Sequence, residues 1–266
     1  MGLKSAGTLP STAIIRTGRW VWSTMWHLMM ARMAPRSREG DYVRPDSEFR
    51  HWVTGDTNAA YPAAEQRYRL IVGMGCPWAH RTLVVRALKG LEAAIPVTVV
   101  VPFVDEGGWI FSQQDTDHPA NSTDAPGMLR PQDAGHSLAE FYRATQPGYK
   151  GRSTVPVLWD SQSNTIVNNE SAEIIIMLNG AFNPWATVPT LDLYPPELKE
   201  TIEQWNQKIY PAVNNGVYRC GFAQTQAAYD RAVDELFSTL DELDGVLASR
   251  RFLCGDRLTL ADIRLF

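Results

Sequence analysis

The chain has few cysteines, and their positions argue against a disulfide framework and against a metal site. Three occur in 266 residues, at Cys76, Cys220 and Cys254, far apart and with no CxxC pair. An odd number without paired spacing is not a disulfide framework and fits a reducing compartment. The five histidines also lack metal-ligand spacing, and no cysteine pair accompanies them. We therefore expect no metal site.

Long apolar runs and an excess of positive charge are absent too. No apolar run reaches the roughly 18 residues that a membrane span needs, so we expect no membrane insertion. The net charge of −4 argues against a protein that binds the phosphate backbone of nucleic acids. Hydrophobic residues make up 44% and charged residues 20%. A chain of this length and composition can bury a core without disulfides or metal.

Acidic residues are missing from positions 1–38, which hold six basic residues. The same stretch has Ser, Thr and an aromatic-rich run at 20–26, WVWSTMW. This composition is typical of organelle transit peptides. The alternative is a surface extension that packs on the body through its tryptophans. We therefore expect a basic N-terminal extension at 1–39 and a cytoplasmic or organellar location.

Beyond this extension the periodicity predicts an α/β domain. Residues 68–72 are β-prone, Pro77 suits the first turn of a helix that runs to Lys89, and Gly90 closes that helix. Residues 95–103 are rich in β-branched side chains and predict a second strand. Strand, helix and strand in this order imply a parallel pair of strands.

The segment at 105–150 is too long to be a plain connection between two elements. We expect it to be a functional insertion or to carry short helices, such as one over 137–143. Residues 155–160 and 165–167 then predict a hairpin, and a helix follows over 170–178.

After a proline-containing linker at 183–196 the pattern becomes purely helical. Long helical patterns cover 197–210 and 224–247, with no strand between them. The sequence thus predicts an α/β domain over 40–185 and an all-helical domain over 192–266. At the end of the chain, Thr259 and Asp262 have the spacing of a helix N-terminus, yet few residues follow. This indicates a chain cut off at Phe266.

The strongest functional signal is Cys76, which lies between the end of a strand and a helix that begins at Pro77. Unpaired backbone N–H groups and the helix dipole stabilise an anion at such a place. The thiolate is the nucleophilic form of cysteine, and His80 and Arg81 add positive charge if they face it. The alternative is a small buried cysteine without reactivity. The placement favours a reactive thiol.

The position of a second redox cysteine is occupied by Ala79. A single thiol can form a mixed disulfide but needs an outside thiol to resolve it, and glutathione is the natural candidate. Ala79 thus disfavours a dithiol protein oxidoreductase. We expect no tightly bound cofactor, with glutathione as a cosubstrate.

Two further motifs fit a peptide-like ligand, and each has a plainer alternative. A cis bond between Val155 and Pro156 would leave the backbone groups of Val155 free to pair with such a ligand. A trans proline that starts a strand is the commoner case. Glu170 and Ser171, at a strand–helix junction, suit the ammonium and carboxylate groups of an amino acid. Simple helix capping would also account for them.

Together these residues resemble the signature of the Xi class of glutathione transferases, the glutathionyl-hydroquinone reductases. The resemblance covers about Gly40 to Phe266. Beside residues 44–50, the matching blocks are CPWAHR at 76–81, LKGLE at 88–92, GWIF at 108–111, TVPVLWD at 154–160, NNES at 168–171 and NNGVYR at 214–219.

The resemblance implies a thioredoxin-like N-terminal domain, a helical glutathione-transferase-type C-terminal domain and a homodimer. It implies that Cys76 is the nucleophile. It further implies that Tyr218 lines the pocket for the aromatic part of the substrate. The residues that would hold glutathione are Trp109, Val155, Glu170 and Ser171.

The function that follows is the glutathione-dependent reduction of S-glutathionyl-hydroquinones through a mixed disulfide of Cys76 with glutathione. The expected partners are glutathione and aromatic glutathionyl-hydroquinones, not nucleic acids or membranes. The nearest alternative is an omega-like thioltransferase or dehydroascorbate reductase with the same thiol, and residues 76–81 and the insertion favour the first function. Another alternative is a non-catalytic binding module on a glutathione-transferase fold.

Overall fold

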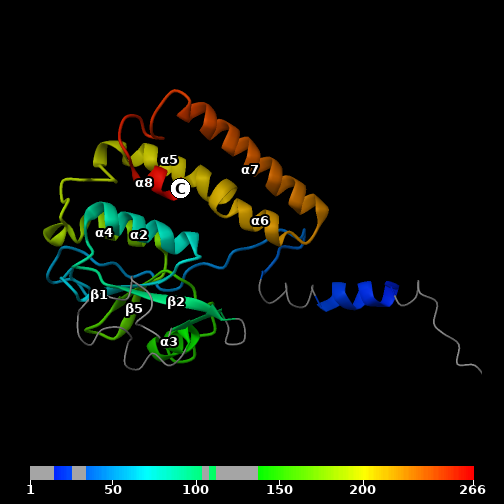
Figure 1. Ribbon diagram of the computed structural model, residues 1–266, viewed down its shortest axis with the longest axis horizontal. Coiled ribbons are helices and arrows are strands. Elements are labelled where there is room, and N and C mark those ends of the chain that lie inside the picture. The colour runs from blue at the N-terminus through cyan, green and yellow to red at the C-terminus, as the bar shows by residue number, and fades with distance from the viewer. Residues whose placement is uncertain (1–14, 26–33, 104–107, 112–136) are drawn as a thin grey trace, which may run out of the picture. The chain divides into compact units, whose positions relative to one another are not determined.

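The computed structural model describes residues 15–25, 34–103, 108–111 and 137–266 (Figure 1). Internal packing divides the chain into two compact units. The first unit comprises Met1–Pro45 and Tyr210–Glu242, and the second comprises Asp46–Ile209 and Leu243–Phe266. The predicted domain boundaries at 39, 185 and 192 stay a prediction, because packing units need not coincide with domains.

The second unit is built on a five-stranded sheet in the order β3-β2-β1-β4-β5. Its strands β1 and β2 are parallel, as the strand–helix–strand pattern predicts, and the other neighbouring pairs are antiparallel. All residues of β1 are buried, as expected of a central strand with helices on both faces. The strands are β1 (Tyr68–Gly73), β2 (Val97–Phe103), β3 (Gly108–Phe111), β4 (Val157–Asp160) and β5 (Thr165–Asn168).

Helices cover both faces of this sheet. Helices α2 (Pro77–Lys89) and α4 (Ser171–Gly180) pack against each other on one face, and α3 (Leu138–Thr145) lies on the other (Figure 1). Helix α2 ends at Gly90, whose φ of 62° lies in the left-handed region that glycine adopts at little cost. The fold class predicted for this part of the chain, a thioredoxin-like α/β arrangement, is confirmed.

In its described residues, the segment at 105–150 contains one element that the sequence predicts and one that it misses. The helix expected over 137–143 is present as α3, and Ser137 and Glu140 form a capping box at its start. The missed element is β3, an edge strand whose Trp109 lies opposite Pro102 of β2. A strand of four residues is too short to show a clear alternation. Residues 112–136 lie outside the described residues.

The helical part of the second unit begins after β5 and α4. It contains η2 (Asn183–Trp185), η3 (Pro196–Leu198), α5 (Lys199–Ile209) and α8 (Leu260–Leu265). Helix α8 packs against α5 and also contacts α2 and α4. Its predicted start is present, since the backbone N–H of Thr259 donates to the Asp262 carboxylate at 2.9 Å.

Beyond residue 209, the described residues of the first unit are mostly helical. It contains the π-helical turn η4 (Tyr210–Asn214), α6 (Gly216–Phe222) and the residues of α7 (Gln226–Leu247) up to Glu242. The sequence predicts α7 but neither η4 nor α6, because Pro211 and two glycines interrupt the helical pattern there.

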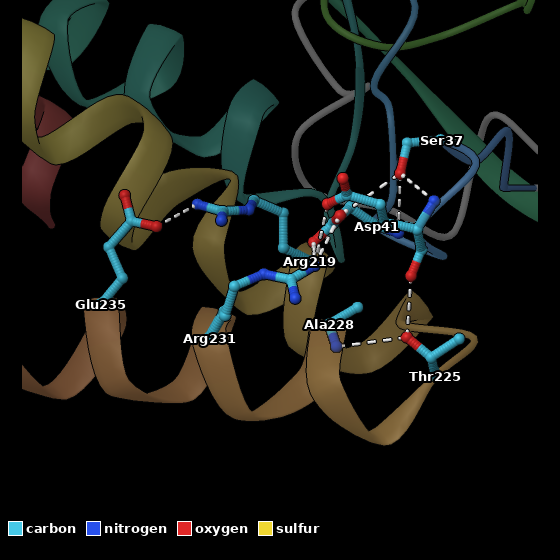
Figure 2. A network of polar contacts seen from close by, with 8 residues as sticks. Ser37, Asp41, Arg219, Thr225, Ala228, Arg231 and Glu235 are labelled. Atoms are coloured by element: carbon cyan, nitrogen blue, oxygen red, sulfur yellow. Dashed lines mark hydrogen bonds and ion pairs between the residues drawn. The ribbon is translucent and has the colours of Figure 1, made fainter.

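A polar network in the first unit links an N-terminal turn to α7 (Figure 2). Arg231 pairs with both carboxylate oxygens of Asp41, at 2.9 and 3.1 Å. The hydroxyl of Thr225 donates to the carbonyl oxygen of Glu39 at 2.9 Å. Ser37 closes the turn, because its Oγ accepts from the backbone N–H of Asp41 at 3.2 Å. Hydrogen bonds and an ion pair thus hold residues 37–41, beside a small apolar cluster in which Tyr218 and Phe222 pack against Ala34 and Tyr42.

The N-terminal extension is described in part. Residues 15–25 are helical, and Trp20 and Trp22 on this helix are 68% and 70% exposed. Trp26 lies outside the described residues, and the surface extension that packs on the body through its tryptophans stays a prediction. The transit peptide at 1–38 stays a prediction. Within the described ranges, no helix combines the length and the apolar character that crossing a membrane requires.

Candidate functional site

Cys76 lies between the end of β1 and the start of α2, as the sequence predicts. It is the N-cap residue of α2, with extended backbone angles (φ −100°, ψ 114°), and Pro77 follows in the first turn. Its carbonyl oxygen already accepts from the N–H of His80 at 3.0 Å. The first turn contains no acidic residue, so no charge in that turn opposes an anion at the helix N-terminus.

The thiol of Cys76 is half-buried and contacts a second predicted site residue. Its Sγ lies 3.5 Å from the carbonyl oxygen of Val155 and donates to it. The other two cysteines, Cys220 and Cys254, are also free and half-buried. Burial raises the pKa of both of these thiols, which lowers the share of the reactive thiolate at neutral pH.

Val155 lies just before β4, at the start of the predicted hairpin. The peptide bond between Val155 and Pro156 is cis, so the less common of the two arrangements expected from the sequence is the one present. Val155 itself is 5% exposed. Its carbonyl oxygen is engaged by Cys76, while its backbone N–H has no hydrogen-bond partner in the part of the chain that the structure describes.

Trp109 reaches the same region from the edge strand β3. Its ring lies directly over Gly73, the last residue of β1, so closely that a Cβ on this glycine would collide with it. The carbonyl oxygen of Gly73 in turn accepts from the backbone N–H of Cys76 at 2.9 Å. Gly73 therefore connects the indole ring of Trp109 to the turn that carries the thiol.

Glu170 and Ser171 lie at the start of α4. Glu170 is the N-cap residue, and its Oε1 accepts from the N–H of Ala172 at 3.1 Å. Its other carboxylate oxygen accepts from the hydroxyl of Ser47 at 2.9 Å. Glu170 therefore caps α4, and the binding of an amino-acid head group by Glu170 and Ser171 stays a prediction. Ser171 is 3% exposed, and its hydroxyl has no hydrogen bond to any described residue.

The sequence did not predict the residues whose hydrogen bonds hold the segments before Val155 and Glu170 in place. Tyr142 of α3 donates from its hydroxyl to the carbonyl oxygen of Thr154 at 2.8 Å. The same hydroxyl accepts from the side-chain amide of Asn169 at 3.1 Å. A further support is Phe49, whose backbone exchanges hydrogen bonds with Asn169. The partners are far apart along the chain, so no local pattern could have shown these contacts.

The remaining predicted residues have other neighbours. Tyr218 lies on α6 in the first unit, where the guanidinium of Arg44 lies 5.5 Å from the centre of its ring. Its role as a pocket residue stays a prediction. In the second unit, the guanidinium of Arg81 lies 4.7 Å from the centre of the Trp78 ring. A contribution of Arg81 to the charge beside Cys76 likewise stays a prediction.

The described residues contain no group of three or more His, Cys, Asp or Glu side chains arranged to hold a metal ion. The chemically active groups that the fold gathers in this region are one thiol, backbone groups and the side chains around Glu170.

Comparison with known proteins identifies both parts of the chain. Residues 75–181 match the family model of the glutathione S-transferase N-terminal domain, and residues 226–266 match that of the C-terminal domain. Among curated proteins, the chain is 43% identical to glutathionyl-hydroquinone reductase YqjG of Escherichia coli over 252 residues. That match covers 92% of this chain and 72% of the relative.

Solved structures give the same result. The glutathione S-transferase Xi from Phanerochaete chrysosporium is 45% identical with a TM-score of 0.74, over 84% of this chain and 72% of that one. The glutathione-bound structure of YqjG from Escherichia coli is 45% identical with a TM-score of 0.71, over 82% of this chain and 69% of that one.

Proposed function

The chain belongs to the Xi class of glutathione transferases, the family of the glutathionyl-hydroquinone reductases, and from this premise we propose that it reduces S-glutathionyl-hydroquinones to hydroquinones with glutathione. One observation carries the proposal. A single half-buried thiol, Cys76, caps the N-terminus of α2, and Ala79 stands where a resolving cysteine would be. Such a thiol can accept one glutathionyl group and needs a second glutathione to lose it.

The reaction runs in two steps. In the first, the Cys76 thiolate attacks the sulfur of the glutathionyl-hydroquinone, the sulfur–aryl bond breaks, and the ring carbon takes a proton as the hydroquinone leaves. Glutathione is then disulfide-linked to Cys76. In the second step, the thiolate of another glutathione attacks the glutathionyl sulfur of this disulfide. Oxidised glutathione leaves and the Cys76 thiolate is regenerated, so two glutathionyl groups are oxidised while the aryl carbon is reduced.

The groups around Cys76 suit a peptide ligand. The backbone N–H of Val155 is available to pair with the backbone of glutathione, and the indole of Trp109 over Gly73 offers an apolar wall. Glu170 and the hydroxyl of Ser171 would hold the γ-glutamyl end through its ammonium and carboxylate groups. The capping bonds of Glu170 would keep its carboxylate in place for this contact.

The acceptor side, assembly and location belong to the same proposal. Tyr218 would line the pocket for the aromatic ring, where a phenol hydroxyl can donate a proton or a hydrogen bond as the sulfur–aryl bond breaks. We expect glutathione to be a cosubstrate, with no tightly bound cofactor. A homodimer and a location in the cytoplasm or in an organelle follow from the family resemblance and from the basic segment at 1–38.

The test is an assay of product formation with matched variants. The wild type with an S-glutathionyl-hydroquinone and reduced glutathione should release hydroquinone and oxidised glutathione in equal amounts. Cys76→Ser should abolish this release, while Cys254→Ser, which changes a thiol outside the proposed site, should leave it close to the wild-type rate. Release by Cys76→Ser at the wild-type rate would show that the nucleophile is assigned wrongly.

Parallel assays separate the alternatives. Turnover of dehydroascorbate or of glutathionyl disulfides without any turnover of the hydroquinone conjugate would replace the proposal by an omega-like thioltransferase. Binding of glutathione without turnover of any of these compounds would indicate a binding module.

A further inference from the structure

Tyr142, on the helix of the insertion, joins the two segments that the proposed function assigns to glutathione. Its hydroxyl donates to the carbonyl oxygen of Thr154 at 2.8 Å and accepts from the Asn169 amide at 3.1 Å. Thr154 directly precedes Val155, and Asn169 directly precedes Glu170. One phenol oxygen thus ties the segment expected to pair with the backbone of glutathione to the one expected to hold its γ-glutamyl end.

The hydrogen bond from the Asn169 amide to Tyr142 also sets the orientation of that amide. The Oδ1 atom of the same amide accepts from the backbone N–H of Phe49 at 3.3 Å, and the backbone N–H of Asn169 donates to the Phe49 carbonyl at 3.0 Å. Tyr142 therefore fixes which end of the amide faces which partner. Asn169 is 6% exposed, so without the phenol its amide nitrogen would be left buried without an acceptor, which is costly.

The ring of Tyr142 has no freedom to move away. It is fully buried and packs edge-on against Phe49 at 5.5 Å and beside Tyr149 at 5.2 Å between ring centres. Burial raises the pKa of its phenol, so the hydroxyl keeps its proton at neutral pH and the bond to Thr154 persists. The same hydroxyl can then serve as donor and acceptor at once.

A continuous set of contacts leads from the thiol to the head-group segment. Cys76 donates to Val155, the preceding Thr154 is held by Tyr142, and Tyr142 holds Asn169. All of these residues belong to the second unit. The spacing between the thiol and the start of α4 is therefore set in part by one hydroxyl group contributed by the insertion.

We propose that Tyr142 is a positioning residue of the glutathione site, acting through Thr154 and Asn169 to hold the segments of Val155 and Glu170 at the separation that bound glutathione requires. The inference rests on the proposed function for its ligand. It assigns to the insertion helix α3 a part in glutathione binding, although Tyr142 need not touch the ligand.

The experiment compares two variants that each remove one hydroxyl from the same aromatic cluster. Tyr142→Phe removes the bridging hydroxyl. Tyr149→Phe removes a hydroxyl that, among the described residues, donates to the carbonyl oxygen of Arg152 alone, at 3.0 Å. Calorimetric titration with reduced glutathione should show a dissociation constant about tenfold higher for Tyr142→Phe than for the wild type. Tyr149→Phe should stay within about twofold of the wild type, since its lost bond lies outside the bridge.

Kinetics distinguish positioning from general stability. With Tyr142→Phe, KM for glutathione should rise about tenfold while kcat at saturating glutathione stays within about twofold, at a temperature where both proteins are folded. A lower melting temperature with an unchanged dissociation constant would overturn the proposal and leave Tyr142 as a packing residue. Equal effects of the two phenylalanine variants would also overturn it.

A second variant keeps the test decisive if Tyr142→Phe folds poorly. Asn169→Ala removes the same link from the other side and should by itself raise the dissociation constant for glutathione to a similar degree, and an unchanged constant would overturn the proposal. Where both single variants fold, the double variant should lose less than the sum of the two losses. Additive losses would contradict an action through Asn169. Failure of the proposed function gives a different result. A wild type that binds glutathione but releases no hydroquinone refutes the reaction, and the ratio of the dissociation constants of Tyr142→Phe and wild type for glutathione still tests the role of Tyr142. A wild type that does not bind glutathione refutes both.

Discussion

The Sγ atom of Cys76 lies 3.5 Å from the carbonyl oxygen of Val155, a residue 79 positions further along the chain. The contact brings the start of α2 and the segment before β4 to one point. Only a protonated thiol can donate to this oxygen, so the hydrogen bond is absent in the thiolate form that the proposed function requires. A ligand backbone that pairs with Val155 would then lie beside the free thiolate.

Cys76 should be the thiol that glutathione disulfide modifies at neutral pH. Burial raises the pKa of Cys220 and Cys254, so these two are mostly protonated at pH 7 and react slowly. Mass spectrometry of the treated protein should find one glutathione adduct, on Cys76. Adducts on the other two cysteines should increase as the pH is raised toward their own pKa values. Modification of only those two at pH 7 would contradict the prediction.

Gly73→Ala should destabilise the second unit through the ring of Trp109. The new Cβ would collide with the indole, and overpacking of this kind costs about 1–3 kcal/mol. Gly75→Ala is the control, since a Cβ there has nothing within 4 Å. Urea unfolding should show a loss for the first variant and little for the second. Trp109→Ala in the same chain should remove most of the cost of Gly73→Ala, and an undiminished cost would show that the ring is not its cause.

Asp160→Asn should lower stability by about 3 kcal/mol at neutral pH. Its side chain is fully buried, and Arg67 donates to both carboxylate oxygens, at 2.9 and 2.7 Å. Glu197→Gln is the control because its ion pair with Arg257 is exposed, and such pairs contribute little. Urea unfolding of both variants measures the difference, and similar losses would contradict the prediction.

The loss of stability caused by Asp160→Asn should also depend on pH. Burial acts to raise the pKa of this carboxyl, but hydrogen bonds from Arg67, Ser163 and the N–H of Gln162 outweigh it, and the net result is a lowered pKa. The carboxylate therefore stabilises the fold fully above its ordinary pKa of 3.8, and this stabilisation is lost as the pH falls through the lowered value. The difference between wild type and Asp160→Asn should shrink in that acidic range, and a difference that stays constant there would be inconsistent with this account.

Asp262→Ala should destabilise α8, so that this helix unfolds locally more often. The Asp262 carboxylate accepts from the backbone N–H of Leu253 at 2.7 Å and from the N–H and hydroxyl of Thr259, both at 2.9 Å. Loss of these bonds should cost about 1–2 kcal/mol. Asp256→Ala, an exposed aspartate nearby, should be close to neutral. Hydrogen exchange of the α8 amides measures the effect, and equal protection in the two variants would refute it.

The sequence predicted elements whose stabilising contacts are local. The parallel β1–α2–β2 unit, the end of α2 at Gly90, the helix after Ser137 and the start of α8 at Thr259 all depend on periodicity or on residues within one turn of each other. The position of Cys76 followed from the same reasoning, because a strand, a proline and a helical pattern adjoin it. Short or interrupted elements such as β3 and α6 lack such a pattern, and the sequence did not reveal them.

By itself, then, the sequence determined that one thiol stands at a helix start with no second cysteine near it. Only the tertiary structure decided what lies against that helix start: the Val155 carbonyl beside the thiol, the Trp109 ring over Gly73, and the Tyr142 hydroxyl between Thr154 and Asn169. The physical reason is that these partners lie far apart along the sequence. A turn or a cap involves neighbours and leaves a pattern in the sequence, whereas these partners meet only after the sheet and its helices have closed the loops between them.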